Sequence, residues 1–218
     1  MLTEERLGDI LLLQSSDEFR LGKDALLLAR FASLHRNDRV CDLGCGVGSL
    51  LLALAERDRS LTLDGVEKRE TAAKLCRENL QRNHLQGTII TGDLQVRYPE
   101  LPWGCYDLVV ANPPYFSPTA GKVAANSARA LARTEGNYTL LSACTTAAHL
   151  CRNGGKFALC LRPERLVELL TALEQCGFAA KRIQFVQSSP EKNANLVLVE
   201  AVRGGKPGVT VLPVKIER

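Results

Sequence analysis

A glycine-rich segment constrains the fold of this 218-residue chain most strongly. Residues 40–43 are a short apolar run typical of a buried strand, Gly-x-Gly-x-Gly follows at residues 44–48, and residues 49–57 have the composition of a helix. Glycines let the backbone approach a ligand closely, and a helix N-terminus favours a carboxylate or phosphate. Strand, glycine loop and helix in this order predict a Rossmann-like, nucleotide-binding α/β fold.

Strand-like and helix-like runs alternate along the rest of the chain. Helical periodicity covers residues 68–83, 138–151 and 162–177. Besides residues 40–43, the predicted strands are residues 61–67, 87–91, 106–111, 157–161, 178–187 and 196–202. A tight reversal joins the last two strands, so we expect them to be antiparallel neighbours. The pattern predicts a doubly wound α/β domain with helices on both faces and roughly seven strands, mostly parallel, with an antiparallel C-terminal hairpin.

A short segment precedes this domain. Residues 10–14 and 19–21 predict a hairpin, and a helix rich in leucine and alanine follows Asp24. Asp24 is expected to cap that helix or to lie beside a bound cofactor. We therefore divide the chain into an N-terminal extension, residues 1–37, and a main domain, residues 38–218.

Two acidic residues follow predicted strands at the sheet edge where α/β folds bind ligands. Glu67 lies roughly 20 residues after the glycine loop, where an acid commonly accepts hydrogen bonds from ribose hydroxyls. Asp93 and Leu94 follow the next strand, where a carboxylate and a backbone N–H can contact a base. The alternative for both acids is an ordinary strand-end or turn position.

The tetrapeptide Asn112-Pro113-Pro114-Tyr115 directly follows the apolar strand of residues 106–111. The prolines end the strand because they lack the N–H that a sheet ladder needs. A planar amino group is a poor nucleophile, since its lone pair is delocalised, and a site that acts on it must accept both N–H groups. The Asn112 side-chain oxygen and the Pro113 carbonyl can accept them, and the Tyr115 ring can stack on the flat target. The alternative is a plain turn, because Asn-Pro commonly begins turns.

This tetrapeptide resembles the catalytic motif of S-adenosylmethionine-dependent amino methyltransferases, which act on adenine N6, guanine N2 or a protein glutamine amide. The glycine spacing after Asp42 is also similar to their loops, and it differs from the wider dinucleotide-binding pattern. Over residues 20–203 the chain most resembles tRNA adenine-N6 methyltransferases of the valine-tRNA type. The other matching segments are residues 22–29, Phe116, residues 129–135, residues 195–200 and Gly204-Gly205. Lys23 departs from that family, whose members often have a small or hydroxyl residue there.

The resemblance implies a class I methyltransferase fold, S-adenosylmethionine as cofactor, and RNA, most often tRNA, as partner. The implied catalytic residues are Asn112, Pro113, Pro114 and Tyr115. The implied cofactor-binding residues are Asp24, Asp42, Gly44, Gly46, Gly48, Glu67, Lys68, Asp93, Leu94 and Asn112. The implied substrate-binding residues are Phe116, Lys122, Arg129 and Arg133. Catalysis would be mostly positioning, because the methylated nitrogen is acidic and needs no base before transfer.

Composition and charge bear on the partner, on metal and disulfide sites, and on where the protein works. Net charge is +4, which permits a nucleic-acid partner without demanding one. The segment after the motif, residues 116–135, predicts a basic loop with a short helix near residues 124–132, and the basic tail, residues 203–218, either frays or touches nucleic acid. Eight cysteines without a Cys-x-x-Cys pair, together with three histidines, favour reduced thiols over a zinc site or a disulfide scaffold. We expect a cytoplasmic protein without a metal or a membrane span.

Three rival functions stay open. A protein glutamine-N5 methyltransferase shares the tetrapeptide, but such enzymes usually carry a helical domain before the glycine loop, and only about 40 residues precede it here. Guanine-N2 methylation of ribosomal RNA is the second rival. The third is a cofactor-binding module that supports a partner without catalysing transfer.

Overall fold

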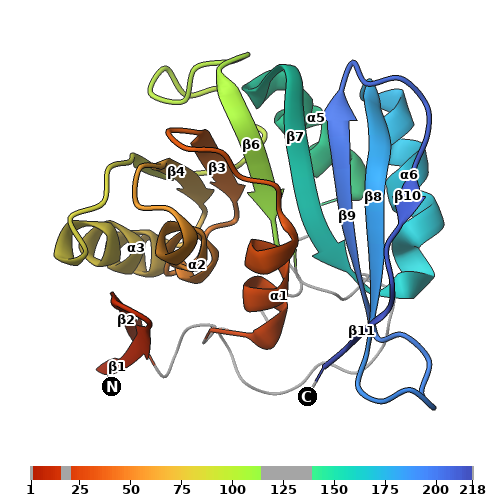
Figure 1. Cartoon of the computed structure of the whole chain (residues 1–218). Helices are drawn as coiled ribbons and strands as arrows, with labels where there is room; N and C mark the ends of the chain where they lie inside the picture. Colours follow the sequence, from red (N-terminus) through yellow and green to blue (C-terminus); the bar gives the residue numbers. More distant parts are fainter. Residues whose placement is uncertain (1, 16–20, 114–138, 218) are drawn as a thin grey trace.

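Figure 1 shows the computed structural model of the chain, which describes residues 2–15, 21–113 and 139–217. A nine-stranded sheet runs through the molecule in the order β10-β8-β9-β7-β6-β3-β4-β5, and β11 also pairs with β8. Its seven main strands are β3 (Arg39–Leu43), β4 (Thr62–Glu67), β5 (Ile89–Thr91), β6 (Tyr106–Ala111), β7 (Cys151–Leu161), β8 (Phe178–Gln187) and β9 (Leu196–Arg203). The predicted set of strands is confirmed.

Parallel pairing dominates the sheet, and β9 is the exception. β3 pairs in parallel with both β4 and β6, and β6 pairs in parallel with β7. β9 runs antiparallel between β7 and β8, which confirms the predicted C-terminal hairpin. The chain order reverses between β3 and β6, so these neighbours form the switch point where open α/β sheets bind ligands at their carboxyl ends.

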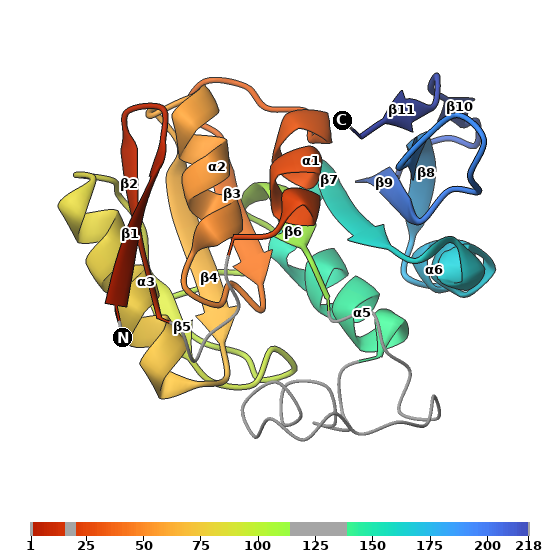
Figure 2. The ribbon, with the colours of Figure 1, turned by 90° about the horizontal axis from the view of Figure 1, so that it is seen from below.

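Helices cover both faces of the sheet, as predicted (Figure 2). Successive strand residues point to opposite faces, and both faces are buried: Val40 and Val110 belong to one core cluster, whereas Cys41 and Val109 belong to the other. The first cluster packs under α1 (Lys23–Phe31), α2 (Ser49–Arg57) and α3 (Glu70–Arg82). The second packs under α5 (Leu140–Leu150) and α6 (Leu166–Gln175), which follows a short 3-10 turn, Pro163–Arg165.

The N-terminal hairpin differs from its prediction. β1 (Leu2–Leu7) pairs antiparallel with β2 (Ile10–Ser15), so the partner of the predicted strand lies before it and not at residues 19–21. Leu21 belongs to no strand, and residues 16–20 lie outside the described part of the chain. The side chains of β1 are almost all exposed, so no burial pattern marked this segment as a strand. β2 instead buries its apolar side chains against α2 and α3.

Two further expectations need correction. Asp24 does not cap α1: Gly22 is the N-cap, without a side-chain cap hydrogen bond, and Asp24 lies in the first turn. The basic tail forms two short strands, β10 (Thr210–Val211) and β11 (Lys215–Ile216), which pair in parallel with β8. Lys23, the departure from the resembled family, lies 3.2 Å from Glu217 just after β11. The short helix predicted near residues 124–132 lies outside the described residues.

Candidate active site

The glycine loop lies at the carboxyl end of β3 and requires its glycines for two different reasons. Gly44, Gly46 and Gly48 have φ angles of 83°, 55° and 88°, which side chains other than glycine rarely adopt. A Cβ at Gly44 or Gly46 would meet no atom within 4 Å, so the loop faces open space there. A Cβ at Gly48 would lie 2.7 Å from the Cys76 sulfur of α3, so this end of the loop packs against the protein.

Glu67 connects the loops that follow three strands. Its Oε2 accepts a hydrogen bond from the Gly46 N–H at 2.9 Å, and its Oε1 accepts from the backbone N–H and Nε of Arg69 at 3.0 and 3.1 Å. Its backbone carbonyl accepts from the Gly92 N–H at 2.9 Å. Only 7% of Glu67 is exposed, so the acid predicted to bind a ribose is a fixed part of the site floor.

Asp42 is a buried carboxyl group just before the loop. It is 2% exposed, and its Oδ1 has no hydrogen-bond partner among the described residues. Burial, with the nearby negative charge of Glu67 as a second cause, raises the pKa of Asp42 from 3.8 to about 8. An unpaired buried acceptor is costly, so Asp42 would gain from a cationic or hydrogen-bond-donating ligand at the loop.

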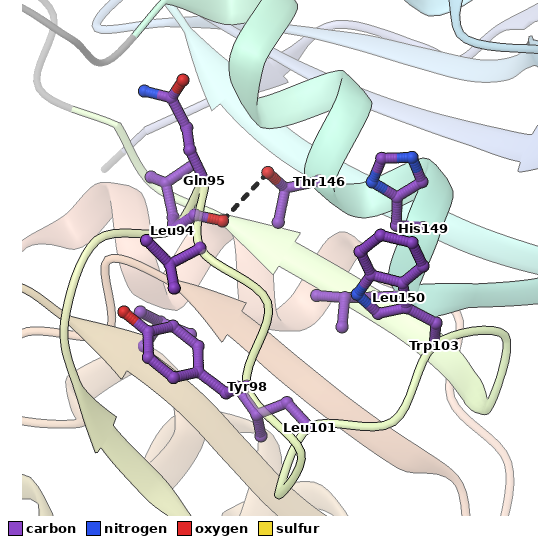
Figure 3. A pocket seen from close by; sticks show the side chains of 10 residues that line it. Leu94, Gln95, Tyr98, Leu101, Trp103, Thr146, His149 and Leu150 are labelled. Atoms are coloured by element: carbon purple, nitrogen blue, oxygen red, sulfur yellow. Dashed lines mark hydrogen bonds between the residues drawn. The ribbon is translucent and has the colours of Figure 1, made fainter.

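Asp93 and Leu94 form a turn after β5. The Asp93 Oδ1 accepts from the Gln95 N–H at 2.9 Å, and the Asp93 carbonyl accepts from the Tyr98 hydroxyl at 3.1 Å. The Leu94 carbonyl accepts from Thr146 of α5 at 3.1 Å, as Figure 3 shows. The turn is thus anchored to the second face of the sheet.

A pocket opens on the far side of this turn, between residues 94–103 and α5 (Figure 3). Trp103 stacks on His149 there, with their ring centroids 4.2 Å apart. Leu94 lines this pocket, but neither Glu67 nor Asn112 does. We therefore separate it from the site at the carboxyl ends of the strands.

Asn112 and Pro113 follow β6 at the switch point. The register of β6 on β3 pairs Val110 with Asp42, and continuing it by two residues places Asn112 beside Gly44. The Asn112 Oδ1 accepts a hydrogen bond from the thiol of Cys160 on β7 at 3.0 Å. Cys160 is fully buried, and this neighbouring strand therefore holds the Asn112 side chain.

Of the other predicted site residues, the structure describes only Asp24 and Lys68. Asp24 is half-buried in the first turn of α1, which begins at the carboxyl end of the sheet (Figure 1), and Lys68 is exposed beside Glu67. The remaining candidates lie outside the described residues: Pro114, Tyr115, Phe116, Lys122, Arg129 and Arg133.

Sequence reasoning did not single out three residues that shape the site: Arg69, Cys160 and Asn79. Arg69 lies two residues after Glu67, so the sequence alone could have indicated an ion pair between them. Cys160 contacts Asn112 across 48 residues, and Asn79 contacts the glycine loop across 32 residues. Nothing in the local sequence marks such contacts, because tertiary packing creates them.

The strand order and the loops at its switch point define a class I methyltransferase fold, and solved structures agree. A predicted O-methyltransferase, Atu636 from Agrobacterium tumefaciens, superposes with a TM-score of 0.71 and 24% identity, covering 88% of this chain and 86% of that one. The T. thermophilus 16S rRNA N2 G1207 methyltransferase, solved with AdoMet and guanosine, has a TM-score of 0.64 and 22% identity over 93% of this chain and 50% of its own.

Residues 15–142 match the methyltransferase small domain, and the chain belongs to this family. Among similar curated proteins, the tRNA1(Val) (adenine(37)-N6)-methyltransferase of Aeromonas hydrophila is 35% identical over 85% of this chain and 77% of its own length. The protein of the same name from Tolumonas auensis is 31% identical, over 88% and 78%. Membership in this family confirms the predicted resemblance to methyltransferases, and the role of the tetrapeptide stays a prediction.

Metal-ligand clusters and membrane-spanning helices are both missing among the described residues. No group of three or more metal-ligating side chains gathers in that part of the chain. No described helix combines the length and apolarity needed to cross a membrane.

Proposed function

We propose that this protein is an S-adenosylmethionine-dependent methyltransferase that methylates N6 of an adenine in tRNA. One observation carries the proposal: the Asn112-Pro113 turn lies at the switch point, in register with the glycine loop of β3. A cofactor over the loop and a planar amine at Asn112 would therefore be neighbours. The similarity to enzymes named tRNA1(Val) (adenine(37)-N6)-methyltransferase supports adenine in tRNA as the target.

The residues present fit S-adenosylmethionine, which supplies a methyl group on a positively charged sulfur. Gly44 and Gly46 leave space for it, because a Cβ at either position would point into an open volume. The unpaired Oδ1 of Asp42 suits the positive charge of this ligand. Glu67 would bind the ribose: a carboxylate has about four acceptor sites, and among the described residues Gly46 and Arg69 donate three hydrogen bonds to it.

Asn112 would accept one N–H of the target amine with its side-chain oxygen, which the Cys160 thiol helps to orient. A carbonyl oxygen has two acceptor sites, and the thiol at 3.0 Å occupies one of them. The Pro113 carbonyl would accept the second N–H of the amine, which leaves the nitrogen lone pair directed at the methyl group. Transfer then depends on alignment and not on a base.

The remaining assignments complete the proposal. Asp93 and Leu94 would contact the adenine of the cofactor, and Asp24 and Lys68 would lie at its rim. Tyr115 and Phe116 would stack on the target base, and a stacked base contributes roughly 1–3 kcal/mol. Lys122, Arg129 and Arg133 would bind RNA phosphates.

We further propose that residues 38–218 form the catalytic domain and residues 1–37 an extension, and that the protein works in the cytoplasm. None of the eight cysteines forms a disulfide and six of them are buried, which suits a reducing compartment.

The test is methyl transfer from labelled S-adenosylmethionine to total tRNA, total ribosomal RNA and a protein extract in parallel, with nucleosides resolved afterwards. We expect the label in tRNA as N6-methyladenosine. Label in N2-methylguanosine of ribosomal RNA, or in glutamine, would contradict the proposed substrate but leave the proposed cofactor in place. Binding of S-adenosylmethionine without label in any fraction would support the non-catalytic module.

A further inference from the structure

Asn79 of α3 and Asn83, the C-cap residue of this helix, bind the edge of the N-terminal hairpin. Asn79 and Asn83 lie four residues apart and therefore share one face of the helix. The Asn79 Oδ1 accepts from the Leu13 N–H at 2.8 Å, and its Nδ2 donates to the Leu13 carbonyl at 2.9 Å. Asn83 makes the same pair of bonds with Leu11, at 2.8 and 2.7 Å. The two amides thus pair with β2 as a neighbouring strand would.

Asn79 differs from Asn83 in one bond. Its Nδ2 also donates to the carbonyl of Val47 at 2.8 Å, and Val47 is the central residue between Gly46 and Gly48. The remaining donor of Asn83 instead goes to the Asn79 carbonyl within α3, also at 2.8 Å. One side chain, which is fully buried, therefore joins the hairpin and the glycine loop.

The bond from Asn79 restrains Val47, which lies between two flexible glycines of the loop. Val47 is 3% exposed, so its carbonyl has little access to water if Asn79 is removed. Glycine has the least restricted backbone of all residue types, and the flanking residues Gly46 and Gly48 both have left-handed φ angles. Cys76, one turn before Asn79 on α3, packs under Gly48, so α3 supports the loop at two points.

We propose that Asn79 is a positioning residue for cofactor binding, which preorganises the glycine loop and couples it to the N-terminal hairpin. The proposal rests on the proposed function, because it requires that S-adenosylmethionine binds at this loop. Loss of the Val47 bond would let the loop sample other conformations, and binding would then have to restore the bound one. Asn83 is the natural control, since it binds the hairpin without contacting the loop.

The experiment compares full-length Asn79→Ala and Asn83→Ala by calorimetric titration with S-adenosylmethionine and by urea unfolding. Each variant loses its pair of hairpin bonds, so we expect both to be less stable. We expect only Asn79→Ala to bind the cofactor more weakly, by about three- to tenfold, the range of one lost hydrogen bond. Equal affinities in the two variants, whether unchanged or equally reduced, would overturn the positioning role.

A second pair of variants removes the amide donors without leaving a cavity. Asn79→Asp and Asn83→Asp keep the size of the side chain and the acceptor for the β2 N–H, but lose the donors. The same difference in affinity is expected between them. If the wild type does not bind S-adenosylmethionine, the proposed function fails; if it binds and the two variants behave alike, only the role of Asn79 fails.

Hydrogen exchange gives an independent readout of the coupling. Because coupling between two sites is reciprocal, cofactor binding should slow exchange of the Leu13 amide in the wild type. In Asn79→Asp this protection should be lost, whereas in Asn83→Asp it should remain. Absence of cofactor-dependent protection in the wild type would contradict the link between hairpin and loop.

Discussion

At the residue scale, Asp42 makes a prediction about pH. Its pKa is about 8 in the folded protein and near 3.8 when unfolded, so the folded state holds the proton more tightly. Below pH 3.8 the Asp42 carboxyl group is protonated in both states and does not change the free energy of unfolding. Between pH 3.8 and about 8 it lowers the free energy of unfolding as the pH rises. Asp42→Asn removes the ionisation, so the variant should become more stable than the wild type across this window, by up to about 1.4 kcal/mol per pH unit.

Thermal unfolding of both proteins between pH 4 and pH 9 measures this difference. The two melting temperatures should diverge steadily up to about pH 8, the pKa of Asp42, and then run parallel. Parallel curves over the whole range would show that Asp42 ionises normally and that its burial has no electrostatic cost.

Cys160 makes a second prediction at this scale. Its thiol donates to the Asn112 Oδ1 at 3.0 Å, so Cys160→Ala removes one restraint on the amide that we propose binds the target amine, whereas Cys160→Ser keeps a donor. We expect the alanine variant to lose roughly tenfold or more in kcat, because misorientation by a fraction of an ångström is costly. The serine variant should recover most of this loss, and cofactor affinity should stay constant in both. Full activity of Cys160→Ala would remove the positioning role.

At the scale of the element, a buried carboxylate joins three strands. Asp64 of β4 accepts from the Tyr106 hydroxyl of β6 at 2.8 Å and from Nε and Nη2 of Arg39 at 2.9 and 2.8 Å. It also accepts from the Thr88 N–H before β5 at 2.7 Å. Arg39 and Tyr106 begin their strands, so this cluster lies away from the carboxyl ends and has a structural role.

Asp64→Ala should therefore destabilise the protein without changing cofactor affinity at the temperature where it is folded. The substitution leaves the buried Tyr106 hydroxyl without its acceptor, which typically costs about 1–3 kcal/mol, whereas the partly exposed Arg39 can reach water. Urea unfolding measures the loss, and titration with S-adenosylmethionine is the control. A loss below about 1 kcal/mol, the range of exposed ion pairs, would contradict this role.

The elements also show what sequence can and cannot predict. β6, β8 and α2 have the predicted bounds, because continuous apolar runs and helical composition identify buried elements directly. β1 is exposed and β10 has two residues, so neither carries a periodic signal. Sequence also located Glu67 and Asn112 at the carboxyl ends of β4 and β6, the two strands that flank β3. It could not predict the Cys160 and Asn79 contacts, which depend on how distant segments pack.

At the scale of the whole molecule, charge bears on the RNA partner. The net charge of +4 is small, so a local basic segment has to supply most phosphate contacts. We expect the double variant Arg129→Ala/Arg133→Ala to weaken tRNA binding and to reduce the slope of log affinity against log salt by about two. Binding assays over a range of salt concentrations measure the slope. An unchanged slope would place the phosphate contacts elsewhere, and cofactor affinity should not change.

The most direct test starts from the tRNA for which the similar curated enzymes are named: a tRNA1(Val) transcript and a matched transcript in which guanosine replaces adenosine 37, each incubated with labelled S-adenosylmethionine. We expect about one methyl group per tRNA, recovered as N6-methyladenosine, in the first transcript and none in the second. Asn112→Ala should bind the cofactor and lose at least about a hundredfold in rate. Equal label in both transcripts would move the target to another nucleotide. Label in a different nucleoside, or none with cofactor bound, would contradict adenine N6 methylation itself.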